Sequence, residues 1–116
     1  MLLTESTNVS KFDAWQNAAI EAFEIENSDA VVVDEANNMM TINYDVEGNT
    51  FNVVIDLNKM LITVKYSDPE DKTKIYTSVY KIPSEDTVED FIRAIANVLF
   101  WGNPEGENLL NDNELT

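Results

Sequence analysis

Apolar side chains recur at three- and four-residue spacing in a segment near the start of the chain. The members of this stripe are Phe12, Trp15, Ala19, Ala22 and Phe23. One apolar stripe at that spacing predicts an amphipathic helix over roughly residues 11–25. Ser10 is the expected N-cap, and Asp13 three residues later completes a weak capping box.

A second and stronger apolar stripe lies near the other end of the chain. Its members are Val88, Phe91, Ile92, Ile95, Val98 and Leu99. The spacing predicts a second helix, and Gly102 and Pro104 are the residues expected to end it. Ser84, Asp86 and Thr87 are rival N-caps, with Thr87 and Asp90 forming another possible capping box.

Between the two helices, apolar and polar residues alternate in runs bounded by turn residues. The predicted strands cover about residues 30–33, 40–46, 51–57, 60–66 and 75–82. Strict alternation is typical of antiparallel strands with one buried and one wetted face. Asn58 and Lys59 are the expected two-residue turn between the third and fourth runs.

The order of these elements predicts an α+β fold. We expect an antiparallel β-sheet meander of four to five strands, with an N-terminal and a C-terminal helix packed on one face. Residues 1–101 would form a single α+β domain. Residues 102–116 would form an acidic C-terminal tail, and the sequence leaves open whether this tail is ordered.

Charge adds the first information about partners. The chain has 22 Asp and Glu against 7 Lys and Arg, a net charge of −15, and 44% of its residues are hydrophobic. That hydrophobic content argues against a disordered chain. So large a negative charge repels nucleic acid and anionic membranes and attracts basic surfaces from a distance.

The residues needed for common catalytic and metal sites are largely missing. The chain has no Cys and no His, and its three glycines form no phosphate-binding loop. We therefore expect no enzyme activity, no cofactor and no metal site, and we read the acidic segments 68–71 and 103–114 as solvated loops rather than calcium sites. The first residues lack a basic n-region and no long apolar run occurs, so a cytoplasmic protein is expected.

Two acidic segments are the candidate partner-binding sites. One is the outer face of the first helix, where residues four apart lie about 6 Å apart along a line that could imitate a phosphate track. The other is the segment 84–90, where helix capping accounts for only part of the acidity. The candidate residues are Asp13, Glu21, Glu24, Glu85, Asp86, Glu89 and Asp90.

Apolar residues near these segments offer a different kind of contact. Trp101 follows the second helix and is read as a core residue, with an exposed anchor as the alternative. Val54 and Leu61 fall on the outer face of the predicted sheet, where they could extend an apolar patch or form a homodimer face.

Three hypotheses for function follow. The first is an acidic inhibitor of the DNA-mimic, immunity or phage anti-defence type, which occupies the basic groove of a nuclease or other nucleic-acid-binding protein. The alternative is an acidic cytosolic chaperone or adaptor of the secretion-chaperone type, which binds a client through an apolar patch. The third is that the acidity only keeps the protein soluble in a salt-adapted host.

Overall fold

One five-stranded antiparallel sheet, in the order β1-β2-β3-β4-β5, organises the chain. The computed structural model describes residues 11–46, 48–68 and 70–115, so the expected N-cap Ser10 lies outside the described residues. The strands are β1 (Val31–Asp34), β2 (Met39–Val46), β3 (Asn49–Asp56), β4 (Leu61–Ser67) and β5 (Ile75–Lys81). The helices are α2 (Lys11–Phe23), α3 (Val88–Ile95) and α4 (Glu107–Asn113). Shorter helical turns are η1 (Ser28–Ala30), η2 (Glu35–Asn37), η3 (Glu85–Thr87) and η4 (Ala96–Phe100).

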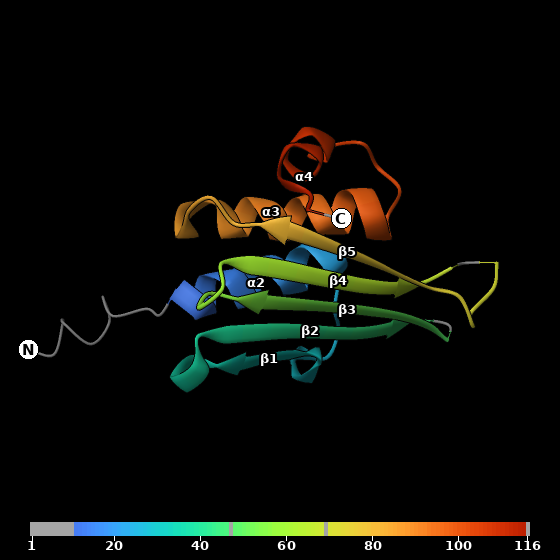
Figure 1. Ribbon diagram of the computed structural model, residues 1–116. Helices are drawn as coiled ribbons and strands as arrows, with labels where there is room; N and C mark the ends of the chain where they lie inside the picture. Colours follow the sequence, from blue (N-terminus) through green and yellow to red (C-terminus); the bar gives the residue numbers. More distant parts are fainter. Residues whose placement is uncertain (1–10, 47, 69, 116) are drawn as a thin grey trace, which may run out of the picture.

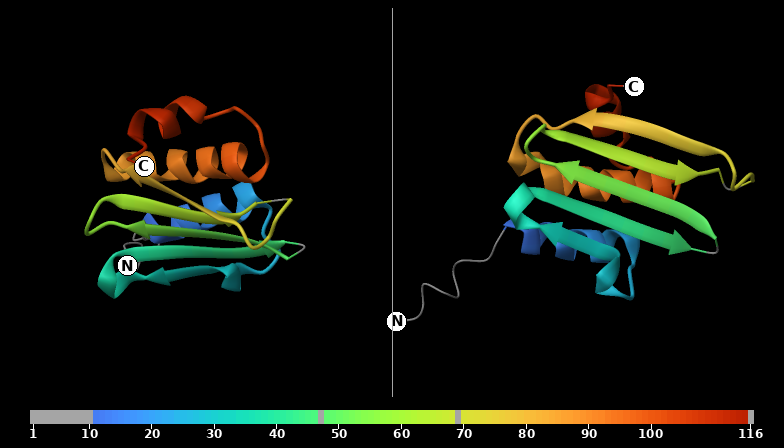
Figure 2. Two further views of the ribbon diagram at one scale, coloured as in Figure 1. Left: turned by 45° about the vertical axis from the view of Figure 1, so that its right-hand side comes forward. Right: turned by 60° about the horizontal axis from the view of Figure 1, so that its bottom comes forward.

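The helices α2 and α3 lie side by side on one face of the sheet, and α4 lies beyond α3 near the β5 edge (Figure 1). In the right-hand view of Figure 2 the opposite face of the sheet is turned forward and carries no helix. The predicted fold class, an antiparallel meander with both terminal helices on one face, is confirmed. Within the described residues, no helix is long and apolar enough to cross a membrane.

The core lies between the sheet and this pair of helices. Alternate strand residues point inward, as the period of two predicted. The buried apolar strand residues are Val31, Met40, Ile42, Phe51, Val53, Ile55, Ile62, Val64 and Tyr80. Phe23 of α2 and Phe91 of α3 are fully buried against them. The apolar sides of α2 and α3 and the inner face of the sheet therefore form one continuous core.

The first helix ends two residues earlier than the sequence pattern suggested, at Phe23. The next residue, Glu24, has a φ of 55°, in the left-handed region. The Ile25 N–H donates to the Ile20 carbonyl at 2.9 Å, and the Glu24 N–H donates to the Glu21 carbonyl at 3.3 Å. These two bonds form a Schellman motif, whose left-handed position is usually occupied by Gly.

Replacing Glu24 by Gly is expected to stabilise the protein. Because a side chain in the left-handed region is strained, relief of that strain should raise the free energy of unfolding by about 0.5–1 kcal/mol. Urea denaturation measures the change. Glu24→Ala removes the same charge but keeps a Cβ, so it should give no gain; an equal gain in both variants would contradict the explanation.

The loop between β3 and β4 is longer than predicted. It spans the four residues 57–60 rather than Asn58 and Lys59 alone, because Asp56 pairs with Leu61. Met60, expected in the strand, instead lies in the loop with a φ of 53°. The Asp56 carboxylate holds the loop, accepting hydrogen bonds from the Asn58 and Lys59 N–H groups at 2.9 and 3.2 Å.

The start and end of α3 also differ from the prediction. Neither Ser84 nor Thr87 caps a helix with its side chain; the Thr87 hydroxyl instead donates to the Ser84 carbonyl at 2.7 Å. The predicted capping box is therefore absent, and the 3-10 turn η3 leads into α3. At the other end, η4 is a π-helical turn in which the Trp101 N–H donates to the Ala96 carbonyl at 2.9 Å.

The acidic segment after Gly102, whose order the sequence left open, contains α4. Leu110 of this helix is buried, and Gly106 before it lies so close to Ala94 of α3 that a Cβ would sit 2.7 Å from the Ala94 Cβ. Beyond α4, Glu114 bridges to Tyr80 and the Leu115 N–H donates to the Val79 carbonyl at 2.7 Å. Residues 107–115 thus cover part of the β5 edge.

Candidate functional site

Two ion pairs join α2 to the α3 segment, and each carries a carboxylate predicted to bind a partner. The Lys11 ammonium lies 2.5 Å from Glu85, and the Arg93 guanidinium lies 3.3 Å from Glu21. Arg93 also contacts Glu89 at 3.4 Å, one turn earlier on its own helix. We call the exposed side of α2, η3 and α3 the α2–α3 face.

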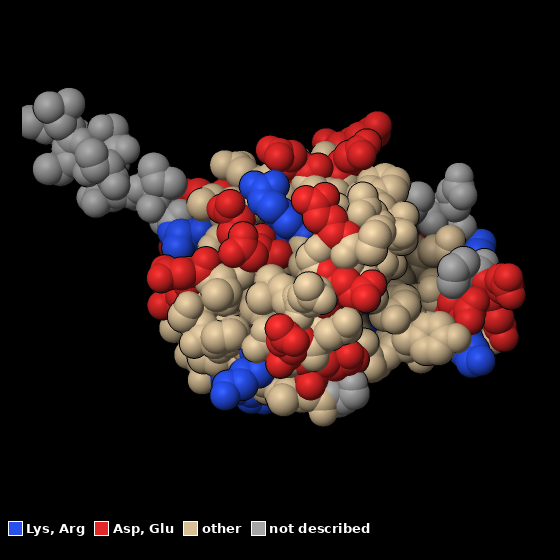
Figure 3. Space-filling view, turned by 90° about the horizontal axis from the view of Figure 1, so that it is seen from above, with Lys and Arg blue, Asp and Glu red and all other residues tan. Residues whose placement is uncertain are grey.

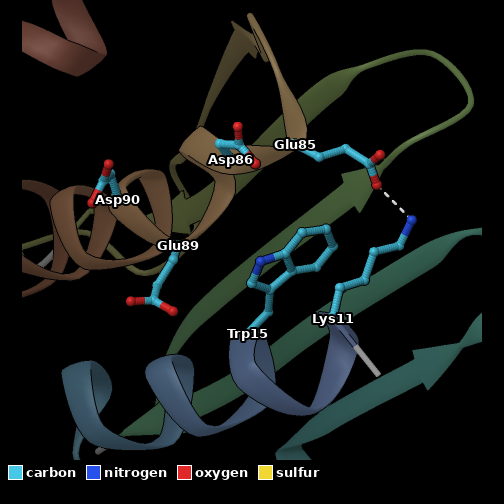
Figure 4. Close-up of a pocket in the computed structure, with 6 residues that line it drawn as sticks. All are labelled: Lys11, Trp15, Glu85, Asp86, Glu89 and Asp90. Atoms are coloured by element: carbon cyan, nitrogen blue, oxygen red, sulfur yellow. Dashed lines mark hydrogen bonds and ion pairs between the residues drawn. The ribbon is translucent and has the colours of Figure 1, made fainter. Parts of the chain in front are cut away.

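A first hollow of about 430 Å³ opens on this face. Figure 4 shows Glu89 extending from α3 toward α2, with Trp15 between the two helices and the Lys11–Glu85 pair closing the far side. The residues that line the hollow are Lys11, Trp15, Glu85, Asp86, Glu89 and Asp90. It therefore gathers four of the seven predicted carboxylates around one cation and one indole ring.

The indole ring of Trp15 is held in place by packing against a neighbouring aromatic ring. Trp15 is buried and packs edge-on against Phe12, with ring centroids 5.4 Å apart. The Lys11 ammonium lies 5.6 Å from the Phe12 ring centroid and 6.0 Å from that of Trp15. At these distances an aromatic face attracts a cation, so the hollow favours positive charge through both its carboxylates and its rings.

A second hollow of about 430 Å³ lies at the other end of the same face. Its lining includes Glu21, Glu24 and Arg93, together with Trp101 from the turn that follows η4. Partial burial lowers the pKa of Arg93, but hydrogen bonds to Glu21 and Glu89 outweigh that effect and hold the pKa above its usual value. Arg93 therefore stays charged and neutralises part of the acidic face.

Trp101 is not the core residue that the sequence favoured. Its side chain is 51% exposed, although its Nε1–H donates to the Ala22 carbonyl at 2.9 Å and its ring packs edge-on against Phe100. The core position is taken by Phe100, whose ring lies 5.4 Å from both Phe23 and Phe51. The π-helical turn sets this outcome, because it inserts an extra residue before Trp101.

The seven predicted residues do not form one continuous track. Asp13 is exposed on α2 but lines neither hollow, and Asn17 interrupts the acidic line between it and Glu21. Glu24 lies at the end of α2, between the second hollow and a third hollow that Glu26 and Asp45 help to line. Figure 3, viewed from the side that carries α4, likewise shows acidic clusters separated by uncharged surface.

Sequence reasoning missed the contribution of the two cations and of Trp15. Nothing in the spacing of Lys11 and Glu85, 74 residues apart, indicated that they meet. The i,i+4 spacing of Glu89 and Arg93 was the one local signal that could have predicted an internal pair. Trp15 was assigned correctly to the core, but its position beneath the acidic hollow depends on how α2 and α3 pack.

Outside this face, a tyrosine–carboxylate pair holds the loop between β4 and β5. The Tyr76 hydroxyl donates to Asp68 at 2.7 Å. This bond lowers the pKa of Asp68 and raises the pKa of Tyr76. Burial similarly raises the pKa of Tyr80 in the core.

Replacing Tyr76 by Phe is expected to raise the pKa of Asp68 back toward its usual value, because the hydroxyl that favours the carboxylate is lost. The stability that this bond contributes is present above the usual carboxyl range and is lost as pH falls through the lowered pKa. NMR titration of the Asp68 carboxyl measures the midpoint. An unchanged midpoint in Tyr76→Phe would contradict the explanation, and Tyr66→Phe serves as the control.

The chemistry of the α2–α3 face is that of a surface that attracts cations. Across residues 11–46, 48–68 and 70–115, no three acidic side chains gather closely enough to hold a metal ion. The hollows are open and bring carboxylates, two cations and the exposed Trp101 ring to the surface, with Trp15 buried beneath the first hollow. No protein-family model, no curated protein and no solved structure matches the chain.

Proposed function

We propose that the protein is an acidic inhibitor, which occupies the basic groove of a nuclease or other nucleic-acid-binding protein in the cytoplasm. The observation that carries the proposal is the α2–α3 face, where two hollows are lined by acidic side chains and three carboxylates pair with two cations. The net charge of −15 would speed association with a basic partner over a long range. The carboxylates would replace phosphates against the partner's Lys and Arg.

The internal ion pairs support this mode of binding. The side chains of Lys11 and Glu85 are 44% and 49% exposed, and Arg93 is 40% exposed. Exposed pairs of this kind contribute only about 0–1 kcal/mol. A partner's guanidinium can therefore replace Lys11 or Arg93 at little cost, because the carboxylate remains paired throughout.

The distribution of exposed apolar side chains favours this proposal over the chaperone alternative. In the described part of the chain, the exposed large apolar residues are Val32, Ile75, Tyr76, Trp101 and Leu115. Of these, Trp101 alone lies beside the acidic hollows. A chaperone that bound its client on the α2–α3 face would need a contiguous apolar patch there, whereas a single indole ring among carboxylates suits an Arg or Lys side chain.

The experiment is capture of partners from host lysate at low and high salt, followed by a DNA-binding assay on each captured protein. We expect a basic nuclease or DNA-binding protein that is released by salt and whose DNA binding the protein blocks. Counterion-dependent contacts weaken steeply with salt, so a salt-resistant client would favour a chaperone. A captured protein that still binds DNA in the presence of saturating inhibitor would contradict the proposal.

A further inference from the structure

The outer face of the sheet, which points away from α2 and α3, carries a row of β-branched side chains that crosses all five strands. The strand register pairs Val32 with Thr41, Thr41 with Val54, Val54 with Thr63 and Thr63 with Val79. No helix lies over this face (Figure 2), and Val32 at its edge is 52% exposed. We call these five residues the central row.

A neighbouring row on the same face extends the apolar surface and carries opposite charges at its two ends. In order across the sheet, its members are Asp34, Met39, Asp56, Leu61 and Lys81. Asp56 in the middle directs its carboxylate to the loop N–H groups of Asn58 and Lys59. The row therefore presents a negative end on β1 and a positive end on β5, with Met39 and Leu61 on either side of Asp56.

The charges on the outer face select a different occupant from that of the α2–α3 face. Acidic side chains on the outer face belong to β1, β2 and β3, namely Asp34, Asp45 and Asp56. The basic ones, Lys65 and Lys81, belong to β4 and β5. This face is nearly neutral, and its negative and positive charges lie on different strands. Such a face is complementary to a second copy of itself, whereas a strongly basic partner would find little net attraction there.

We infer that the outer face is a homodimer interface. A twofold axis parallel to the strands gives an isologous contact and places β1 of one copy over β5 of the other. Asp34, whose carboxylate also accepts hydrogen bonds from Asn37 at 2.7 and 3.2 Å, then faces the partner's Lys81. Val54 and Asp56 of the central strand lie at the axis against the partner's Val54 and the partner's Asp56. The Val and Thr side chains of the central row interlock, and the acidic α2–α3 faces point outward in opposite directions, free for other contacts.

The dimer is expected to be weak and to strengthen with salt. Five strands about 4.8 Å apart, with a mean length of about seven residues, present a face on the order of 500 Å². That is below the ~800 Å² per partner of a standard interface, so the dimer should be weak and should dissociate on dilution. Salt screens the repulsion between two chains of −15 each, whereas it weakens binding of a basic protein to the α2–α3 face.

Sedimentation velocity on the full chain over a concentration series, at low and high salt, tests the inference. We expect a reversible monomer–dimer equilibrium that shifts toward dimer as salt is raised. A monomer at every concentration and salt level would overturn the inference. The result does not depend on the proposed inhibition, because the two surfaces lie on opposite faces of the molecule.

Two sets of variants locate the interface. Val54→Lys should weaken dimerisation about tenfold or more, because it brings two ammonium groups together at the axis. Asn17→Lys on α2 makes the same charge change on the other side and should leave dimerisation unchanged. Equal effects of the two variants would overturn the assignment of this face, and circular dichroism confirms that each variant is folded.

The second set reverses the end charges of the neighbouring row. Asp34→Lys and Lys81→Glu should each weaken the dimer several-fold, because each places like charges opposite one another. The double variant restores opposite charges and has the net charge of the original chain, so it should dimerise more tightly than either single variant; the hydrogen bonds from Asn37 to Asp34 stay lost. A double variant weaker than both single variants would overturn the proposed orientation of the two copies.

Discussion

Neutralising the four carboxylates of the first hollow is expected to slow association with the captured basic partner about tenfold or more at low salt. The replacements are Glu85→Gln, Asp86→Asn, Glu89→Gln and Asp90→Asn. They remove four negative charges from one hollow and leave Lys11 without Glu85 and Arg93 without Glu89, so this hollow would lose its attraction for a basic groove. Stopped-flow or surface-binding kinetics over a salt series measures the rate.

A matched control separates this local effect from the total charge. It neutralises four exposed acids elsewhere in the fold, as Glu35→Gln, Glu70→Gln, Asp112→Asn and Glu114→Gln. This variant has the same net charge as the first, so a purely nonspecific attraction would slow both equally. Equal rates for the two variants would contradict the assignment of the binding surface to the α2–α3 face.

Replacing Phe23 by Ala is expected to have the largest effect on stability. Phe23 is fully buried, and its ring lies 5.5 Å from that of Phe51 and 5.4 Å from that of Phe100. Removing a buried aromatic side chain costs about 3–5 kcal/mol, through lost burial and the cavity that remains. A domain of this size has only about 5–15 kcal/mol of stability in total, so the variant should be close to unfolding.

Urea denaturation should show a lower midpoint with an unchanged slope. Phe23→Leu, which keeps most of the buried volume, should lose less stability and keeps the test informative if the Ala variant does not fold. Leu115→Ala is the control, because Leu115 is 56% exposed and its removal should change stability by no more than about 0.5 kcal/mol. A small loss in Phe23→Leu and in Phe23→Ala alike would contradict the role of this aromatic cluster.

The fold could be predicted because its signals are local. The stripes of α2 and α3 and the alternation along β2, β3 and β4 each depend on residues within a few positions of one another. Where the prediction was wrong, the deciding contact was more distant or the backbone was unusual. Glu24 and Met60 adopt left-handed conformations that pattern alone does not indicate, and Trp101 was displaced to the surface by a π-helical turn.

The candidate site was predicted only in part, because a list of acidic residues does not say which of them meet. Glu85, Asp86, Glu89 and Asp90 could be grouped from their neighbourhood in the chain. That Glu85 and Glu21 are paired with Lys11 and Arg93 depends on the packing of α2 against the α3 segment, whereas the Glu89–Arg93 pair is local. Asp13 carries the same charge as the others, yet it lies outside both hollows.

The sequence by itself determined the sign of the protein's own electrostatic field, the α+β class and the two faces of α2, α3 and the strands β2, β3 and β4. These follow from net charge and short-range periodicity, which do not require knowing how elements pack. Tertiary structure alone decided that Lys11 meets Glu85 above Trp15 and that α4 covers the β5 edge. It also aligned Val32, Thr41, Val54, Thr63 and Val79 in one row, because strand register joins residues far apart in the chain.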